Sequence, residues 1–246
     1  EMEARAYARF QAEQIEHEAN LARRAEAAAA TGNPPRGRAP QAPQPAPQPT
    51  DQVNFTDPDS RIMKTKDGFQ QAYNAQAGVE TASRLIVGPR VSQAANDKRE
   101  LVPDAAAVRS HVSAETLLID SGFVSEAAVT AGEKAAPGLT IIAATQREPH
   151  GRTVAQLEKR PDPPAPPPEA PFAERLRHRT GTAAGRALYK LRQQTVEPVF
   201  GIIKEVLGFR RFCLRGLAKV TLEWELVCLA YNLKRLHRLG AALRPV

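Results

Sequence analysis

The chain has 246 residues, of which 42% are hydrophobic and 25% charged, so it can bury one sizeable core. It has no signal peptide and no apolar run of membrane-spanning length, which excludes a membrane-embedded protein and favours a soluble one in the cytoplasm. The two cysteines, Cys213 and Cys228, lie in apolar helical stretches without Cys or His at ligand spacing, and we interpret them as buried thiols.

The positive charge of the chain is concentrated near its C-terminal end. The formal net charge is +7, yet residues 172–246 contain 15 Lys and Arg against 5 Glu, so the remainder is slightly acidic. Such asymmetry favours a polyanionic partner, although a basic face can also serve solubility alone. A basic helical scaffold is therefore one alternative.

The first fifty residues contain a helical pattern and then a linker. Residues 1–30 are rich in Ala, Glu and Arg with few large apolar groups, which predicts a helix with a thin apolar stripe. Residues 31–50 contain seven prolines and predict an extended linker. Because the sequence starts at Glu1 inside the helical pattern, we expect it to be the C-terminal part of a longer protein.

Strand and helix patterns alternate over residues 51–146. Val53 and Phe55 alternate in a short extended run that ends before Pro58, which places Asp57 at a strand end or in a turn. Residues 72–79 and 85–91 predict two strands of a hairpin joined by residues 80–84. Asn96 or Asp97 can cap a helix that runs toward Val108, with Pro103 marking a late start or a kink.

A compact apolar run at residues 116–119 predicts a buried strand that ends in Asp120. A helix at about 125–134 and a strand at 139–144 follow. An aspartate directly after a buried strand stands where a parallel sheet opens its ligand crevice. It can equally be an ordinary turn or helix-capping residue.

The region around residues 189–204 reads as a helix that carries one carboxylate among cations. Glu197 and Lys204 are seven residues apart, and Tyr189 and Arg192 are three apart, so each pair shares a face. An acid flanked by phosphate-binding cations suits metal-dependent phosphoryl transfer on DNA, whereas the plainer interpretation is a solvated ion pair.

The final helix is expected at about 218–239 and is apolar on two sides. One side carries Val220, Trp224, Val227, Cys228 and Tyr231, and the other carries five leucines. Such a helix is expected to pack inside the domain or against a second subunit, with Trp224 in the core. The leucines are Leu222, Leu226, Leu229, Leu233 and Leu236.

Residues 176–239 as a whole resemble the C-terminal end of the DDE transposases of bacterial insertion sequences. The residues that carry the resemblance are Gly185-Arg186, Tyr189, Arg192, Val196 to Gly201 with Lys204, Gly208-Phe209-Arg210, and Asn232 to Leu236. In that family the glutamate at the position of Glu197 is the third metal-binding carboxylate. Tyr189, Arg192, Glu197 and Lys204 resemble the family's tyrosine-arginine-glutamate-lysine signature, here with four residues between Arg192 and Glu197 where some relatives have three.

The resemblance also extends to the two other acids. Residues 118–123 resemble the family's second catalytic aspartate motif, which implies Asp120. Residues 54–64 and 68–76 resemble further recurrent segments, and we prefer Asp57 as the first acid. Asp59 and Glu80 remain open for that role. Relatives often have Asp at the position of Glu80, and the longer side chain would move the carboxylate by roughly 1.5 Å.

The resemblance implies a ribonuclease-H-like mixed sheet with flanking helices (α/β class) over residues 51–239, interrupted by a proline-rich insertion at about 148–175 and followed by a tail at 240–246. Asp57, Asp120 and Glu197 would hold two Mg²⁺ or Mn²⁺ ions for cleavage of transposon ends and strand transfer into target DNA. The implied DNA contacts come from Tyr189, Arg192, Lys204, Arg210, Arg211 and Arg215.

The same resemblance implies DNA as partner, a homodimer in the active complex and a location at the nucleoid. The alternative function is a non-catalytic DNA-binding remnant of a truncated or domesticated transposase.

Overall fold

The computed structural model describes residues 2–33, 37–49, 51–65, 68–144, 161–167 and 169–240. The chain divides into two compact units, residues 1–58 and residues 59–246, and each is described by itself. Residues 145–160 and 168, which hold much of the expected proline-rich insertion, and residues 241–246 of the expected tail lie outside the described residues.

The first unit consists of one long helix and an extended segment. Helix α1 spans Met2–Thr31, as its composition predicts. Residues 37–49 and 51–58 contain neither helix nor strand. The prediction of a short strand around Val53 and Phe55 is therefore wrong. The Phe55 side chain is 93% exposed, so the alternating residues have no apolar surface to pack against.

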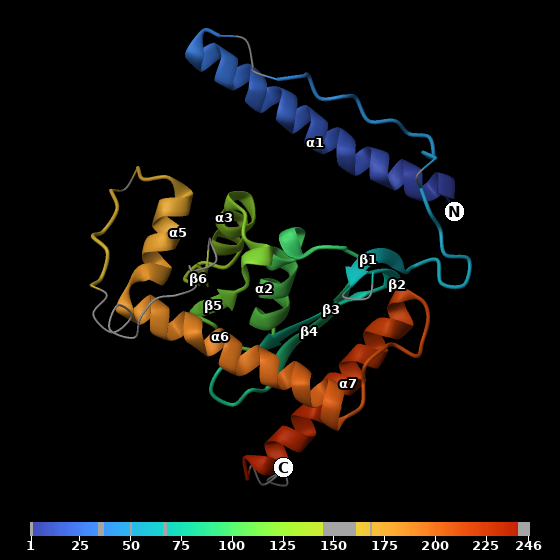
Figure 1. Cartoon of the computed structure of the whole chain (residues 1–246), viewed down its shortest axis with the longest axis vertical. Helices are drawn as coiled ribbons and strands as arrows, with labels where there is room; N and C mark the ends of the chain where they lie inside the picture. Colours follow the sequence, from blue (N-terminus) through green and yellow to red (C-terminus); the bar gives the residue numbers. More distant parts are fainter. Residues whose placement is uncertain are drawn as a thin grey trace. The chain divides into compact units, whose positions relative to one another are not determined.

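The described strands of the second unit form three two-stranded sheets (Figure 1). Strands β1 and β2 pair antiparallel, β3 and β4 form the predicted antiparallel hairpin, and β5 and β6 pair parallel with Thr116 opposite Thr140. The mixed α/β class is confirmed, but the described strands do not join into one continuous sheet. The bounds are β1 Arg61–Thr65, β2 Gly68–Ala72, β3 Asn74–Val79, β4 Ile86–Ser92, β5 Thr116–Ile119 and β6 Thr140–Ala143.

One apolar core surrounds the parallel pair β5–β6. Helices α2 (Leu101–Arg109), α3 (Glu126–Ala135) and α5 (Phe172–Gly181) each contribute to it. Helix α2 begins late, after the 3₁₀ turn η1 (Asp97–Arg99) that the Asn96 side chain caps. Pro103 consequently lies in the first turn of α2, where its missing N–H has no helical partner to lose.

A second core lies between the β3–β4 hairpin and helix α7 (Leu217–Arg238). The other face of the hairpin packs against α2, where Gly78 and Gly88 stand opposite each other in register. A Cβ atom at Gly78 would lie 2.2 Å from Val108 Cγ2, and one at Gly88 would lie 2.8 Å from it. Only glycine allows α2 to approach this closely.

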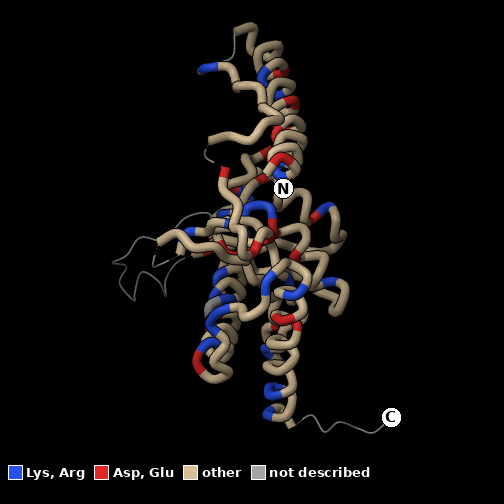
Figure 2. Tube along the Cα trace, turned by 90° about the vertical axis from the view of Figure 1, so that its right-hand side faces the viewer, with Lys and Arg blue, Asp and Glu red and all other residues tan. Residues whose placement is uncertain are grey.

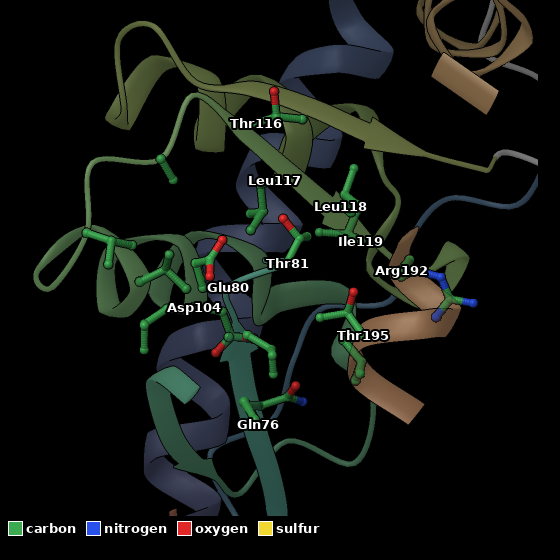
Figure 3. A pocket seen from close by; sticks show the side chains of 18 of the residues that line it. Gln76, Glu80, Thr81, Asp104, Thr116, Leu117, Leu118, Ile119, Arg192 and Thr195 are labelled. Atoms are coloured by element: carbon green, nitrogen blue, oxygen red, sulfur yellow. The ribbon is translucent and has the colours of Figure 1, made fainter. Parts of the chain in front are cut away.

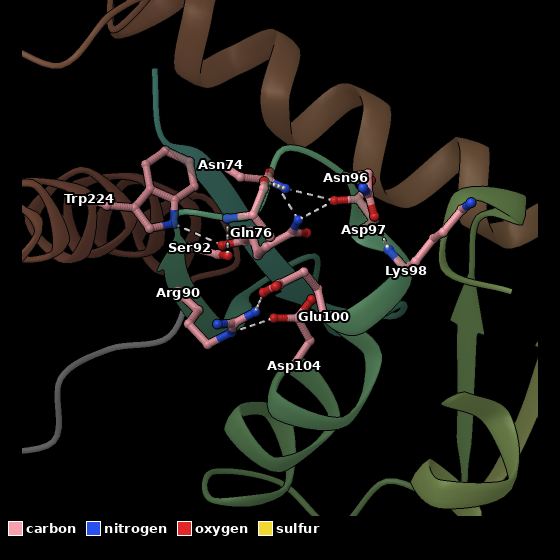
Figure 4. Close-up of polar contacts among 11 residues, drawn as sticks. Asn74, Gln76, Arg90, Ser92, Asn96, Asp97, Lys98, Glu100, Asp104 and Trp224 are labelled. Carbon is pink, nitrogen blue, oxygen red and sulfur yellow. Dashed lines mark hydrogen bonds and ion pairs between the residues drawn. The ribbon is translucent and has the colours of Figure 1, made fainter. Parts of the chain in front are cut away.

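Helix α7 buries one of its two apolar sides. Val220, Trp224, Cys228 and Tyr231 are each at most 2% exposed. The indole N–H of Trp224 donates to the Gln76 carbonyl oxygen at 2.8 Å, which fixes the ring in the core (Figure 4). Burial of Cys228 raises the pKa of its thiol to about 12, as expected for a buried cysteine. The same expectation is wrong for Cys213, which is exposed because it lies in the connection before α7.

Helix α6 spans Ala183–Gly201 and continues into the π-helical turn η3, Ile202–Val206. The Thr182 side chain caps its start by accepting from the Gly185 N–H at 3.0 Å. Pro198 lies inside α6, where it lacks an N–H for the helix ladder. No helix within the described residues has the length and apolar character needed to cross a bilayer.

Candidate functional site

A pocket of about 450 Å³ opens between the end of β3, strand β5, helix α2 and helix α6 (Figure 3). Strands β3 and β5 both line it but do not pair with each other. Arg192 and Thr195 reach it from α6, while Glu80 and Thr81 come from the turn after β3. The walls are mostly apolar, and a few charged groups gather at the strand ends.

Asp120 lines this pocket at the carboxyl end of β5, where the sequence places it. It caps the 3₁₀ turn η2 (Ser121–Phe123), because its Oδ1 accepts from the Ser121 N–H at 2.7 Å. Its other oxygen, Oδ2, lies 3.8 Å from Nη1 of Arg192. Asp120 is therefore a capping residue that also lines the pocket, with a side chain that is 55% exposed, and its catalytic role stays a prediction.

Arg192 is held against the pocket by two neighbours. Its guanidinium carbon lies 5.5 Å from the ring centre of Tyr189, one turn earlier on α6, and its Nη1 pairs with Asp120. The side chain is only 18% exposed, and its Nε has no hydrogen-bond acceptor within the described residues. A guanidinium that lines a pocket is suited to a phosphate oxygen.

Glu197 lies on a different side of α6 from Arg192. Glu197 is five positions after Arg192, which corresponds to a rotation of about 140° on an α-helix. Val196, one residue earlier, lines the pocket, whereas Glu197 is exposed and is not part of the lining. Lys204 lies beyond the start of the π-helical turn, which changes the phase that a continuous α-helix would give it relative to Glu197.

The three acids considered for the first position have different surroundings. Asp57 is buried and belongs to the first unit. Asp59 accepts from the Leu217 N–H at 2.9 Å and so caps the start of α7. Glu80 lines the pocket together with Asp120. Of the three, Glu80 is thus the one that shares a pocket with Asp120.

Glu80 also organises the hairpin turn. Its carboxylate accepts from the Ala82 N–H at 2.9 Å and from the Ser83 N–H at 2.6 Å. A hydrogen bond from the Ser83 side chain, followed by these two backbone bonds, lowers its pKa. The carboxylate is therefore held ionised at the edge of the pocket.

Asp104 lines the pocket as well, and nothing in the sequence pattern singled it out. Burial raises its pKa to about 6, although Arg90 Nε donates to its Oδ1 at 2.6 Å. Arg90 also pairs with Glu100 at the start of α2 (Figure 4). The only available signal was the run of acids at 97, 100 and 104, which does not show that Asp104 lines a pocket.

The other cations expected to contact DNA lie near the connection between α6 and α7. Lys204, Arg210, Arg211 and Arg215 are all exposed. Lys204 Nζ lies 5.9 Å from the ring centre of Phe200, and Arg210 pairs with Glu205. In the view of Figure 2, blue segments mark Lys and Arg along the helices of this unit. The DNA contacts assigned to these residues stay predictions.

The described residues do not bring three carboxylate, His or Cys side chains together as a metal site. Asp120 carries one such group at the pocket, Glu197 is exposed on another side of α6, and Asp57 belongs to the other unit. Glu197 does not line the pocket that Asp120 lines, and the two-ion site expected from the three carboxylates stays a prediction.

The candidate site is thus a pocket at which an arginine of α6 lies beside a strand-end aspartate, and an arginine of this kind can bind phosphate. Residues 168–237 match the family model described as a transposase DDE domain. The resemblance seen in residues 176–239 is confirmed by this match, which covers α5, α6 and nearly all of α7. Searches of curated proteins and of solved structures found no match.

Proposed function

We propose that this protein is a transposase that cuts DNA at the ends of an insertion sequence and transfers the strand into target DNA. The observation that carries the proposal is Arg192, which belongs to the matched segment and lines the pocket with its Nη1 3.8 Å from Asp120 Oδ2. Together these residues bring a phosphate-binding group to the end of β5, in a part of the chain with strong positive charge.

In this proposal the chain binds the DNA backbone through the cations of α6 and of the connection to α7. Arg192 contacts the phosphate nearest to Asp120, with Tyr189 supporting its guanidinium. The exposed Arg211 and Arg215 extend the contact along the strand. The family match implies the use of divalent ions, but the described residues do not form their site, so no reaction step is assigned to them.

The proposed catalytic carboxylates are Asp120, Glu197 and a first acid, with a ribonuclease-H-like sheet as the proposed fold of the active protein. Asp57 was the first choice for the first acid from the sequence. The shared pocket supports Glu80 instead, since both Glu80 and Asp120 line it. Both candidates enter the experiment.

The test is nicking of supercoiled plasmid by the 246-residue chain in Mn²⁺, compared with Asp120→Asn, Glu197→Gln, Glu80→Gln and Asp57→Asn. Glu115→Gln, an exposed carboxylate outside the pocket, is the matched control. We expect the wild type and the control to nick, and Asp120→Asn and Glu197→Gln to lose the activity. If one of the Glu80→Gln and Asp57→Asn variants also loses the nicking activity, that variant identifies the first acid. Nicking that survives both Asp120→Asn and Glu197→Gln would refute the proposed site.

A second candidate function is a DNA-binding protein without catalysis. It is favoured by one observation, namely that the described residues contain no convergent group of three metal-binding side chains. Gel retardation with the same plasmid separates the two functions. Retention of DNA by a wild-type chain that never nicks would support the binding protein, whereas nicking would exclude it.

A further inference from the structure

The turn between β3 and β4 carries Glu80 and Thr81 to the pocket (Figure 3). We call its residues 80–85 the hairpin turn. Two backbone hydrogen bonds close it, because the Glu80 N–H donates to the Leu85 carbonyl oxygen and the Arg84 N–H donates to the Glu80 carbonyl oxygen, both at 2.9 Å. The place of the Glu80 carboxylate therefore depends on the shape of this turn.

The hairpin turn includes one residue in an unfavourable backbone conformation. Arg84 has a φ of 57°, in the left-handed region that a residue with a side chain rarely adopts. The Tyr231 hydroxyl of α7 donates to the Arg84 carbonyl oxygen at 3.0 Å. Tyr231 is 2% exposed and belongs to the core between α7 and the hairpin, so its ring is fixed. The helix thus supports the turn where its backbone is least favourable.

Arg235 lies one turn further along α7 and holds Ser83. Its Nε donates to the Ser83 carbonyl oxygen at 2.6 Å. The N–H of the same Ser83 donates to the Glu80 carboxylate, also at 2.6 Å. Arg235 and Glu80 thus hold the two backbone groups of one turn residue, so a loss of the first contact affects the second.

These two contacts of α7 end on the hairpin turn and not on the strands. Asn232, which lies between Tyr231 and Arg235, bonds instead to Ile86, where β4 begins. Neither Tyr231 nor Arg235 lines the pocket. A side chain that fixes the partner of a functional group, without touching the ligand itself, supports the geometry of a site.

We propose that Tyr231 and Arg235 are positioning residues that hold the Glu80 carboxylate at the pocket through the hairpin turn. This inference rests on the proposed function, in which Glu80 is a candidate for the first acid. It gives α7 a role besides core formation, because the helix then determines where a carboxylate of the hairpin stands.

Amide hydrogen exchange of isotope-labelled protein tests the turn without any reaction. The Ala82 and Ser83 N–H groups donate to the Glu80 carboxylate, so their exchange reports whether it is held in place. Arg235→Met removes the donor and keeps the apolar stem of the side chain. We expect it to speed the exchange of these two amides by about two- to tenfold, the effect of one hydrogen bond, and to leave the amides of β5 unchanged.

Two further variants make this measurement specific. Tyr231→Phe keeps the buried ring and removes the hydroxyl, and it should speed the exchange of the same two amides. Arg238→Met removes an exposed arginine from the last turn of α7 and should leave both amides as in the wild type. Circular dichroism checks that each variant is folded. Folded Arg235→Met and Tyr231→Phe proteins in which Ala82 and Ser83 exchange at the wild-type rate would overturn the proposal.

Plasmid nicking then tests the consequence for the reaction. We expect Arg235→Met to lower the nicking rate at saturating DNA by about 10- to 100-fold and to leave the half-saturating DNA concentration unchanged. Arg238→Met should nick as the wild type does. A folded Arg235→Met protein with faster amide exchange but a wild-type nicking rate would refute the positioning role. A wild type that does not nick counts against the proposed function alone, and hydrogen exchange then decides whether α7 holds the turn.

Discussion

Asn232 of α7 forms two hydrogen bonds with the backbone of Ile86, the first residue of β4. Its Oδ1 accepts from the Ile86 N–H and its Nδ2 donates to the Ile86 carbonyl oxygen, both at 2.8 Å. The side-chain amide thus satisfies backbone groups of the strand in the way that a neighbouring strand would. Two further residues of the same helix, Tyr231 and Arg235, donate to carbonyl oxygens of the hairpin turn.

Replacement of Asn232 by Ala is expected to lower the free energy of unfolding by about 1–3 kcal/mol, because it leaves a partly buried N–H and C=O without partners. Lys219→Ala, at an exposed position of the same helix, is the control and should change stability little. Urea denaturation followed by the fluorescence of Trp224, the single tryptophan, measures both. An Asn232→Ala variant as stable as the control would show that these bonds contribute nothing.

The partly buried carboxyl of Asp104 is expected to make stability depend on pH between about 4 and 6. Burial raises its pKa from 3.8 to about 6, so in this range the folded protein binds a proton that the unfolded chain has released. Stability from this group is therefore full below pH 4 and is lost as the pH rises through 6, by up to about 3 kcal/mol.

The measurement is the difference in unfolding free energy between the wild type and Asp104→Asn from pH 4 to 7. The variant has no proton to release, so the wild type should lose stability relative to it as the pH rises. Glu115→Gln, at an exposed carboxyl, is the control for general charge effects. A wild type that gains stability relative to Asp104→Asn over this range would contradict the assigned direction.

Two adjacent arginines should contribute unequally to DNA binding. Arg210 pairs with Glu205, whereas Arg211 is exposed and makes no ion pair with another described residue. We expect Arg211→Ala to weaken binding to duplex DNA more than Arg210→Ala and to reduce the slope of log affinity against log salt by about 1. Fluorescence anisotropy over a salt series measures both quantities, and equal effects of the two substitutions would refute the assignment.

Much of the local structure could be predicted from the sequence because its signals are short-range. The apolar run that became β5 and the hairpin of β3 and β4 depend on neighbouring residues, and both are present, while Asn96 caps the 3₁₀ turn η1 before α2 and not α2 itself. The run around Val53 failed since alternation describes a strand only when one side can be buried. The pairing of β3 with β5 into one sheet depends on distant contacts that no local pattern encodes, and the described strands do not show it.

The candidate site was predictable to a similar extent. The strand-end position of Asp120 follows from a local pattern, whereas the approach of Arg192 to it was not predicted. The side of α6 that faces the pocket could not be predicted. The sequence shows that Glu197 is five positions after Arg192, but it does not show how the helix is rotated relative to β5. Asp104 was missed because its burial arises from packing between α2 and the hairpin, which are joined only in the folded chain.

The hydrogen bonds between α7 and the hairpin also determine the order in which the parts of this protein can fold during synthesis. Ile86 is synthesised 146 residues before Asn232. At a usual rate of about 5–20 residues per second, the hairpin waits roughly 7–30 s for the helix that covers it. During that interval its apolar face and the unpaired groups of Ile86 are exposed to chaperones and to other nascent chains. Completion of α7, and not formation of the hairpin, is therefore the step that commits this half of the unit to its fold.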